Sequence, residues 1–118
     1  MEQTTDTPES PVLEATGGLV VGLWSCSWPF ASVALYSDRV EFKTVTRVRY
    51  TLTKSDIVSF TSMGWLPTPI TRGVRFLHRR SDYAEKFEFW TSSRDEFLAA
   101  LQAHNFGQYR TDGPEQAT

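Results

Sequence analysis

The sequence predicts a mainly β domain that ends in a single α-helix. Short apolar runs, separated by turn signals, recur about every ten residues, which is typical of an antiparallel β-sandwich or barrel. Apolar and polar residues alternate within 40–43, 47–52 and 86–90, as expected of strands with one face toward water. Near the C-terminus, this alternation gives way to apolar residues at helical spacing.

These runs predict seven strands. We expect them near residues 18–26, 31–37, 39–45, 47–53, 56–63, 73–79 and 85–91. Ser37-Asp38 and the segment 44–47 are short enough for tight hairpin connections. The segment 64–69 contains two prolines, which cannot donate to a β-ladder, so a longer loop is expected there.

The helix has a start signal and a stop signal. Ser93-Arg-Asp-Glu96 matches a capping box, in which the Ser hydroxyl and the Glu carboxylate bond to amides at the helix start. The segment 105–107 supplies the end. The residues expected on one helix face are Phe97, Leu98, Leu101 and His104. We expect one domain at 12–107, between a flexible acidic tail at 1–11 and a flexible tail at 108–118.

The composition indicates one packed domain and bears on the cellular compartment. The chain has 118 residues, of which 40% are hydrophobic and 14% aromatic, so it can form one packed core. Its single cysteine cannot form an internal disulfide, which favours a reducing compartment. Neither a secretory signal pattern nor an apolar run of about 18 residues is seen, so we expect a cytoplasmic protein, either free or membrane-peripheral.

Several phrases in order resemble the pleckstrin-homology (PH) superfold, and the chain looks like its small bacterial PH-like and GRAM-like members. They are WPFASVALYSDRVEF, YTLTKSDIVSF, ITRGVRFLHRRS and FEFWTSSRDEFLAAL, and together they span about residues 17–106. The resemblance implies a barrel of about seven antiparallel strands in two near-orthogonal sheets, capped by one C-terminal helix. It implies lipid binding, peptide binding or a scaffold role, because this fold hosts all three.

One departure from the family pattern bears on function. Phosphoinositide-binding members carry Lys and Arg on the first two strands and the loop between them. The corresponding segment here, GLWSCSWPFASV at 22–33, has no charged residue. The resemblance therefore does not carry inositol phosphate recognition over to this position.

Catalytic chemistry is not expected. Cys26 would need a neighbouring base, but the two histidines, His78 and His104, lie on different predicted elements. Two separate histidines form neither a zinc site nor a catalytic dyad, and no phosphate-binding Gly-rich loop or Gly-x-Ser-x-Gly elbow is present. We expect no enzyme activity, no cofactor and no metal.

The basic middle of the chain is a candidate anion-binding surface, although the formal net charge is −2. On the predicted strands, several arginines alternate with apolar residues and should therefore point outward. The candidates are Arg47, Arg49, Arg72, Arg75, Arg79 and Arg80. Guanidinium groups bind phosphates and carboxylates through paired donors. The alternative is an ordinary solvated sheet face, paired in part with Glu88 or with the acidic tails.

Aromatic and apolar residues provide candidate partner-binding positions. Trp65, Leu66 and Ile70 lie in the proline-containing loop, which either contacts a partner or folds back over an open barrel end. Trp28 is a further candidate, although it shares its parity with Trp24, Cys26 and Phe30, which predicts a buried row. Exposure of Trp28 beside Trp65 would favour binding over packing.

Three function hypotheses follow. The first is a non-enzymatic PH-like module that mediates protein–protein interaction or self-association. The second is a peripheral membrane protein that binds anionic lipid head groups through the arginines. The third is a small-ligand carrier or enzyme with an aromatic cavity. Nucleic acid is not an expected partner, because no RNA-binding motif is present and the isoelectric point is near 5.6.

Overall fold

The computed structural model describes residues 10–64 and 72–110. These residues form β1 (Leu13–Val21), β2 (Trp24–Leu35), β3 (Arg39–Thr44), β4 (Arg49–Thr53), β5 (Ile57–Met63), β6 (Gly73–His78), β7 (Phe87–Trp90), α1 (Arg94–Ala103) and β8 (Gln108–Arg110). The prediction of a mainly β fold with one C-terminal helix is confirmed. The described strands number eight rather than about seven, and they join in one sheet of order β4-β3-β2-β1-β7-β6-β5-β8 rather than in two sheets.

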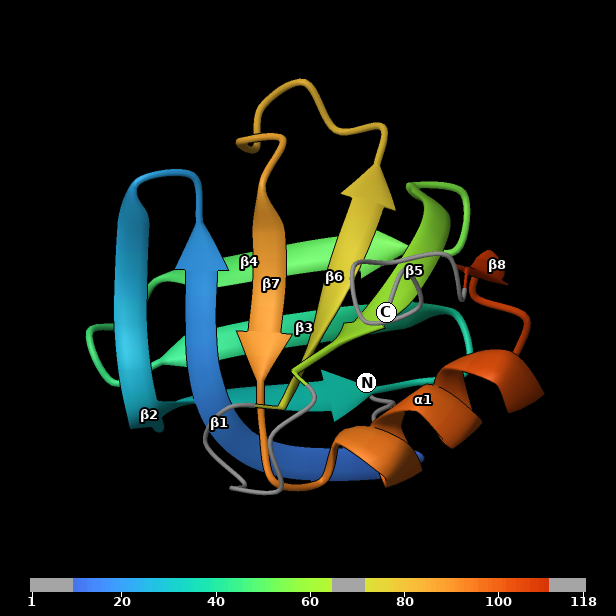
Figure 1. Ribbon diagram of the computed structural model, residues 1–118, viewed down its shortest axis with the longest axis horizontal. Coiled ribbons are helices and arrows are strands. Elements are labelled where there is room, and N and C mark those ends of the chain that lie inside the picture. The colour runs from blue at the N-terminus through green and yellow to red at the C-terminus, as the bar shows by residue number, and fades with distance from the viewer. Residues whose placement is uncertain (1–9, 65–71, 111–118) are drawn as a thin grey trace, which may run out of the picture.

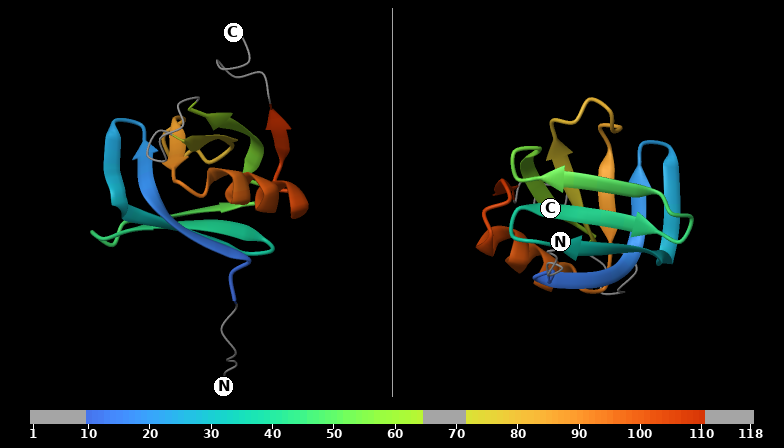
Figure 2. Two further views of the ribbon diagram at one scale, coloured as in Figure 1. Left: turned by 60° about the horizontal axis from the view of Figure 1, so that its bottom comes forward. Right: turned by 180° about the vertical axis from the view of Figure 1, so that it is seen from behind.

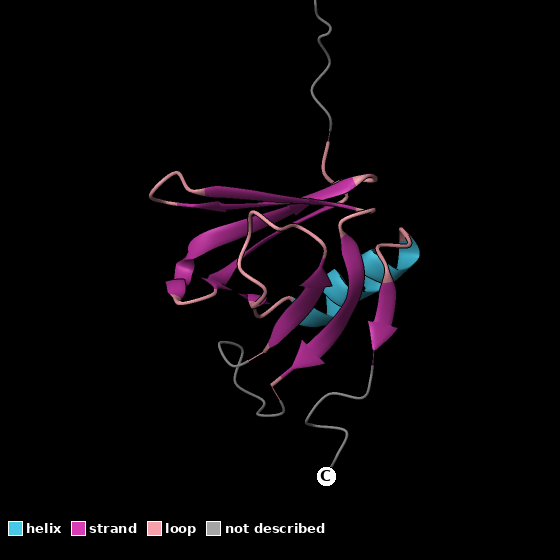
Figure 3. Ribbon diagram, turned by 90° about the horizontal axis from the view of Figure 1, so that it is seen from above, coloured by secondary structure: helices cyan, strands magenta, loops and turns pink. Residues whose placement is uncertain are grey.

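The sheet is strongly curled, so that its two halves face each other. Figure 1 shows β3 and β4 running across β6 and β7, and Figure 2 shows the space between the two halves from the side. Helix α1 lies at one end of this space, as Figure 3 shows from above. The curl gives the sheet an inner face that forms the core and an outer face that meets solvent.

Phenylalanine rings fill the inner face. Phe42 on β3 lies 5.7 Å from Phe76 on β6 and 5.0 Å from Phe87 on β7, measured between ring centroids. These edge-to-face contacts join strands that are far apart in the sheet order. Phe97 of α1 packs 6.0 Å from Phe76 and 5.8 Å from Phe89, so the helix closes the same cluster. The predicted helix face is confirmed for Phe97, Leu98 and Leu101, which are buried.

The first hairpin differs from the prediction. β1 ends at Val21, and β2 begins at Trp24 after a two-residue turn, whereas one strand was expected to run through 18–26. Gly22 makes this turn possible, because its φ of 64° is a left-handed conformation that glycine adopts without steric cost. Alternation alone could not locate the turn, because apolar residues continue on both sides of it.

Strand β4 begins two residues later than expected, at Arg49 rather than at residue 47. Arg47 was predicted to lie in a strand but belongs to the turn before β4, where its φ is 70°. The turn is closed by a hydrogen bond from the Thr44 amide to the Val48 carbonyl (3.1 Å) and by one from the Arg47 amide to the Thr44 carbonyl (2.9 Å). Arg47 therefore projects from a hairpin end and not from a strand face.

The helix start is built differently from the predicted capping box. The Ser93 side chain makes no capping hydrogen bond; instead, the Ser93 amide donates to the Thr91 hydroxyl at 3.1 Å. The predicted helix end is confirmed. His104 is the C-terminal cap, and Asn105 and Gly107 take positive φ values of 60° and 85°.

Strand β8 was not expected, since the predicted domain boundary falls just before it. Gln108–Arg110 pairs in parallel with β5, with Tyr109 opposite Phe60. The Tyr109 ring stacks on Phe60 at 5.6 Å, and its hydroxyl hydrogen-bonds to that of Ser62 at 3.2 Å. Because β8 has three residues, it is too short for alternation of apolar and polar residues to identify it from the sequence.

Gly107 sets the path from α1 into β8, and its replacement tests that role. A Cβ at this position would lie 3.0 Å from the Ile57 and Val58 carbonyl oxygens, in addition to adopting a positive φ. We expect Gly107→Ala to lower the free energy of unfolding by about 1–3 kcal/mol, measured by urea denaturation. The matched variant Asn105→Gly, at the neighbouring left-handed position, should change stability little. Equal stability of Gly107→Ala and the wild type would contradict this role.

Candidate binding surface

Trp28 and Phe30 lie on the outer face of the sheet. Their exposed fractions are 49% and 51%, so the prediction that they belong to a buried row is wrong. The reason is an irregularity in the β1–β2 pairing: Gly17 pairs with Ala31 and Leu19 with Cys26, so residues 27–30 face Gly18 alone. This bulge ends the inward alternation after Cys26.

The residues before the bulge keep the expected direction. Cys26 packs against the hydrophobic core, and its Sγ lies 3.3 Å from the Phe30 carbonyl oxygen, to which it donates. Trp24 lies 6.2 Å from Tyr50, measured between ring centroids. Cys26 therefore packs inward as expected, whereas Trp24 is 36% exposed despite its contact with Tyr50, and the residues beyond the bulge face solvent.

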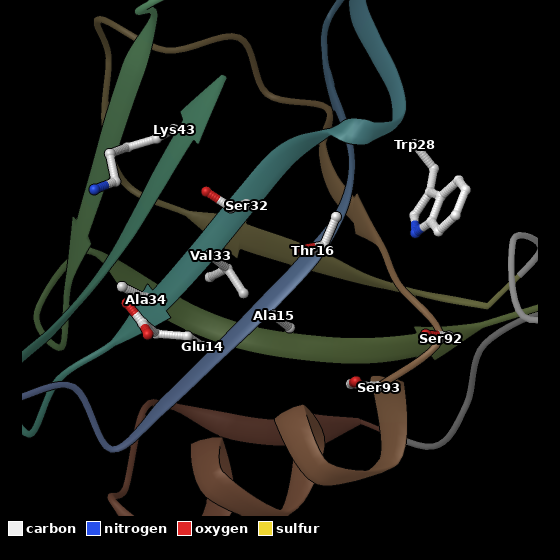
Figure 4. Close-up of a pocket in the computed structure, with 10 residues that line it drawn as sticks. All are labelled: Glu14, Ala15, Thr16, Trp28, Ser32, Val33, Ala34, Lys43, Ser92 and Ser93. Atoms are coloured by element: carbon white, nitrogen blue, oxygen red, sulfur yellow. The ribbon is translucent and has the colours of Figure 1, made fainter. Parts of the chain in front are cut away.

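Trp28 stands between two hollows of the outer surface. The larger, of about 540 Å³, is shown in Figure 4 and runs from Trp28 and Ser93 across Thr16 and Ser32 to Lys43. The smaller, of about 410 Å³, lies between Trp28 and Trp90. Both volumes are in the range of pockets that accept a peptide side chain or a small ligand.

Glycine at position 18 permits this arrangement. A Cβ at Gly18 would lie 2.9 Å from the Trp28 amide nitrogen and 3.0 Å from the Cys26 carbonyl oxygen, closer than real Cβ contacts allow. The bulge can therefore rest directly on the β1 backbone. Trp28 is held on the outer surface by the backbone path and not by a flexible loop.

The predicted partner-binding loop cannot be compared with this surface. Trp65, Leu66 and Ile70 lie outside the described residues. Of the predicted partner-binding positions, Trp28 is the one that the structure places, and it is exposed. Sequence reasoning did not select Phe30 or Val45 for binding, although Val45 is 66% exposed and its amide donates to the Phe30 carbonyl at 3.0 Å.

The six predicted anion-binding arginines do not form one cluster. Arg75 donates from Nε and Nη2 to the same oxygen of Glu88, at 3.0 and 2.8 Å, as the solvated-face alternative anticipated. Glu88 is only 4% exposed, and its other carboxylate oxygen accepts from Trp90 Nε1 at 3.2 Å. Arg75 is thus occupied in compensating a buried carboxylate.

The remaining predicted arginines differ in whether their guanidinium groups already have hydrogen-bond or ion-pair partners. Arg79 donates to the Ser55 carbonyl at 2.7 Å. The Nε of Arg72 is buried and has no hydrogen-bond partner among the residues that the structure describes, and the Arg72 carbonyl accepts the Thr91 amide. Arg47 and Arg49 are exposed and have no carboxylate within 4.0 Å among the described residues.

Arg80 closes an edge of the sheet. On the open side of β4, the Thr51 amide donates to the Tyr83 hydroxyl at 3.0 Å, and Arg80 Nη1 donates to the Thr51 carbonyl at 2.9 Å. The guanidinium carbon lies 4.3 Å from the centre of the Tyr83 ring. Asp82 accepts two hydrogen bonds from Arg80 and orients it. Side chains therefore occupy the groups through which another strand would pair with β4.

The Arg80–Asp82 pair has consequences for titration. The hydrogen bond to Asp82 raises the pKa of Arg80 above its ordinary value, and the same bond lowers the pKa of Asp82. Because the folded pKa of Asp82 is depressed, the pair contributes to stability above pH about 4, the ordinary Asp value, and that contribution is lost as pH falls through the folded pKa.

His78 is held by hydrogen bonds to the backbone. His78 Nε2 lies 2.7 Å from the Ala84 carbonyl oxygen, so this nitrogen carries a proton, and Nδ1 accepts the Arg80 amide at 3.0 Å. Both ring nitrogens are thus engaged with backbone groups.

Within residues 10–64 and 72–110, no three His, Cys, Asp or Glu side chains gather as a metal site would require. No helix in these residues is long and apolar enough to cross a membrane.

The closed β4 edge can be tested with a single-atom change. Tyr83→Phe keeps the ring contacts with Tyr50 and Phe87 but removes the hydroxyl that accepts the Thr51 amide. We expect the Thr51 amide to exchange with solvent about tenfold faster, as measured by hydrogen–deuterium exchange, because one net hydrogen bond is worth about 0.5–1.5 kcal/mol. Tyr36→Phe is the control and should leave Thr51 unchanged. Unaltered exchange in Tyr83→Phe would show that the hydroxyl does not protect this edge.

Comparison with known proteins adds no family to this description. No family model matches the chain, and no curated protein matches it. What the molecule can bind is therefore inferred from its own surface, on which Trp28 and Phe30 are exposed while Arg75 and Arg80 are held by carboxylates.

Proposed function

We propose that this chain is a non-enzymatic PH-like binding module that holds an extended segment of a protein partner on the outer face of its sheet. The observation that carries the proposal is the exposure of Trp28, which lines two hollows, and of Phe30 and Val45, on a sheet whose inner face is already packed. Exposed aromatic side chains held by a rigid backbone are typical anchors of protein interfaces.

The PH-like assignment is supported by the order and placement of the elements. β3 and β4 run across β6 and β7, and α1 follows β7 and lies at one end of the curl. The resemblance implied two sheets, whereas here β1 pairs with both β2 and β7 and makes the sheet continuous. A shared bent strand between two crossing halves is compatible with the same architecture.

A protein partner is better supported than an anionic lipid head group bound by the arginines. Arg75 and Arg80 are paired with Glu88 and Asp82, and Arg79 is bonded to a carbonyl. If Arg75 bound a phosphate instead of Glu88, the buried Glu88 carboxylate would lose its counter-charge and would lie beside a second negative charge. If Arg80 did the same, the β4 edge would be left open. The apolar surface at Trp28 needs no such rearrangement.

A random peptide library displayed against the full chain tests the proposal. We expect selected peptides to lose at least about tenfold in affinity when Phe30→Ser or Trp28→Ser replaces the wild type, because truncation of an aromatic anchor commonly costs 2 kcal/mol or more. Leu77→Ser is the matched control, since Leu77 is 46% exposed on β6 and should not affect binding.

Two results would contradict the proposal. One is a library that yields no peptide binding to the wild type; the other is binding that Phe30→Ser and Trp28→Ser leave unchanged. Sedimentation with phosphatidylserine vesicles supplies the lipid arm of the same experiment. Binding to these vesicles that is lost in Arg75→Gln with Arg79→Gln, in a variant whose circular dichroism matches the wild type, together with no peptide binding, would favour the lipid function instead.

A further inference from the structure

Two rows of outward side chains lie next to each other on the outer face of β2, β3 and β4. The strand register pairs Ser32 with Lys43, and Lys43 with Arg49, so these residues form one row across the strands. Phe30 and Val45 form the next row, joined by the hydrogen bond between their backbones. Arg47 projects from the turn that follows Val45. A cationic row thus borders an apolar row.

No ion pair among the described residues neutralises the cationic row, although Glu14 lines the same hollow as Lys43. Lys43 and Arg49 are direct cross-strand neighbours, and like charges at such positions repel. Within the described part of the chain, no carboxylate lies within 4.0 Å of Lys43, Arg47 or Arg49, whereas Arg39, Arg75, Arg80 and Arg94 all have one. An anionic partner would relieve this repulsion, so the local charge favours acidic groups.

The arrangement of the two rows sets the pattern of those acidic groups. Neighbouring residues within a row lie on adjacent strands about 4.7–4.9 Å apart, the two rows are about 6.5–7 Å apart, and an extended chain sends alternate side chains to opposite sides. A segment that lies along the boundary of the two rows would therefore direct every second side chain toward the cationic row, where the long side chains of Lys43 and Arg49 can reach it. The side chains between them would meet Phe30 and Val45.

We infer that the docking segment of the partner is an extended peptide in which acidic and apolar residues alternate. The inference rests on the proposed function, whose partner chemistry it specifies. Crossing β2, β3 and β4 takes about 10 Å, or three to four extended residues. Lys43 and Arg49 contact the acidic side chains, Phe30 and Val45 contact the apolar ones, and Trp28 marks one end of the contact.

A bilayer surface suits this face less well. Interfacial proteins bury their apolar side chains about 5–10 Å into the boundary between head groups and acyl chains, while their cations stay at head-group depth. Here the cationic and apolar rows belong to the same sheet face and lie side by side rather than at different depths. Alternating side chains of a peptide meet both rows at once.

The test uses a synthetic peptide in which glutamate alternates with phenylalanine or valine, and a counterpart in which lysine replaces glutamate. Binding to the full chain is measured by fluorescence anisotropy at about 50 and 300 mM salt, which spans strong and weak screening of exposed charges. We expect the acidic peptide to bind, and its affinity to fall at least about tenfold at the higher salt or with Lys43→Glu and Arg49→Glu together. The lysine peptide should not bind the wild type.

Matched variants separate this inference from the proposed function. Arg79→Glu with Lys86→Glu makes the same change of net charge at another surface and should alter the affinity by less than about twofold. If Phe30→Ser abolishes binding of the library-selected peptides but the Lys43 and Arg49 variants bind them normally, the apolar anchor stands and the charge inference is wrong. No binding of the acidic peptide, or equal binding of the lysine peptide, would also overturn it.

A lipid source of the negative charge is distinguished in the same series. Phosphatidylserine and phosphatidylcholine vesicles are compared with wild type and with the Lys43→Glu, Arg49→Glu variant. Charge-dependent sedimentation with phosphatidylserine, without binding of the acidic peptide, would assign the cationic row to a membrane surface and overturn the peptide inference. Circular dichroism of each variant checks that these exposed substitutions leave the fold intact.

Discussion

The contact of Phe42 with Phe76, Phe87 and Phe89 is the interaction on which the rest of the structure depends. Phe42 belongs to one half of the curled sheet, and the other three rings belong to the opposite half. Without this cluster, the sheet would have no reason to close on itself, since its two terminal strands are not paired with each other. Helix α1 then needs only Phe97, Leu98 and Leu101 to cover the same core.

The aromatic bulge lies outside a core that other strands fill. Phenylalanine rings occupy the inner face, and the four residues opposite Gly18 carry Trp28 and Phe30 to the outer face. The proposed binding surface thus uses aromatic side chains that the core does not. The same bulge leaves Cys26 on the inner side, where its thiol packs against the core.

The sequence predicted features that depend on local patterns, and it failed where a distant contact decided the outcome. The strands from β3 to β7 and the buried face of α1 follow from alternation and helical spacing, and the helix stop follows from Asn105 and Gly107. The interruption at 27–30 was predicted, since the expected strands stop at residue 26 and resume at 31, but no local pattern indicated that these four residues form a bulge opposite Gly18 inside one strand. The ion-pair partners of the arginines also depend on contacts between distant residues. Arg75 pairs with Glu88 because β6 and β7 are neighbours in the sheet, an order that the local pattern does not reveal.

The closure of the β4 edge by Tyr83, Arg80 and Asp56 affects how copies of this molecule can assemble. Open-ended growth of a sheet through many subunits needs two complementary free edges, one to receive a strand and one to offer it. In the described sheet, β4 is blocked, and the other terminal strand is the three-residue β8. Edge pairing between copies would thus stop at a symmetric pair, and the fold is protected against fibre formation by this route.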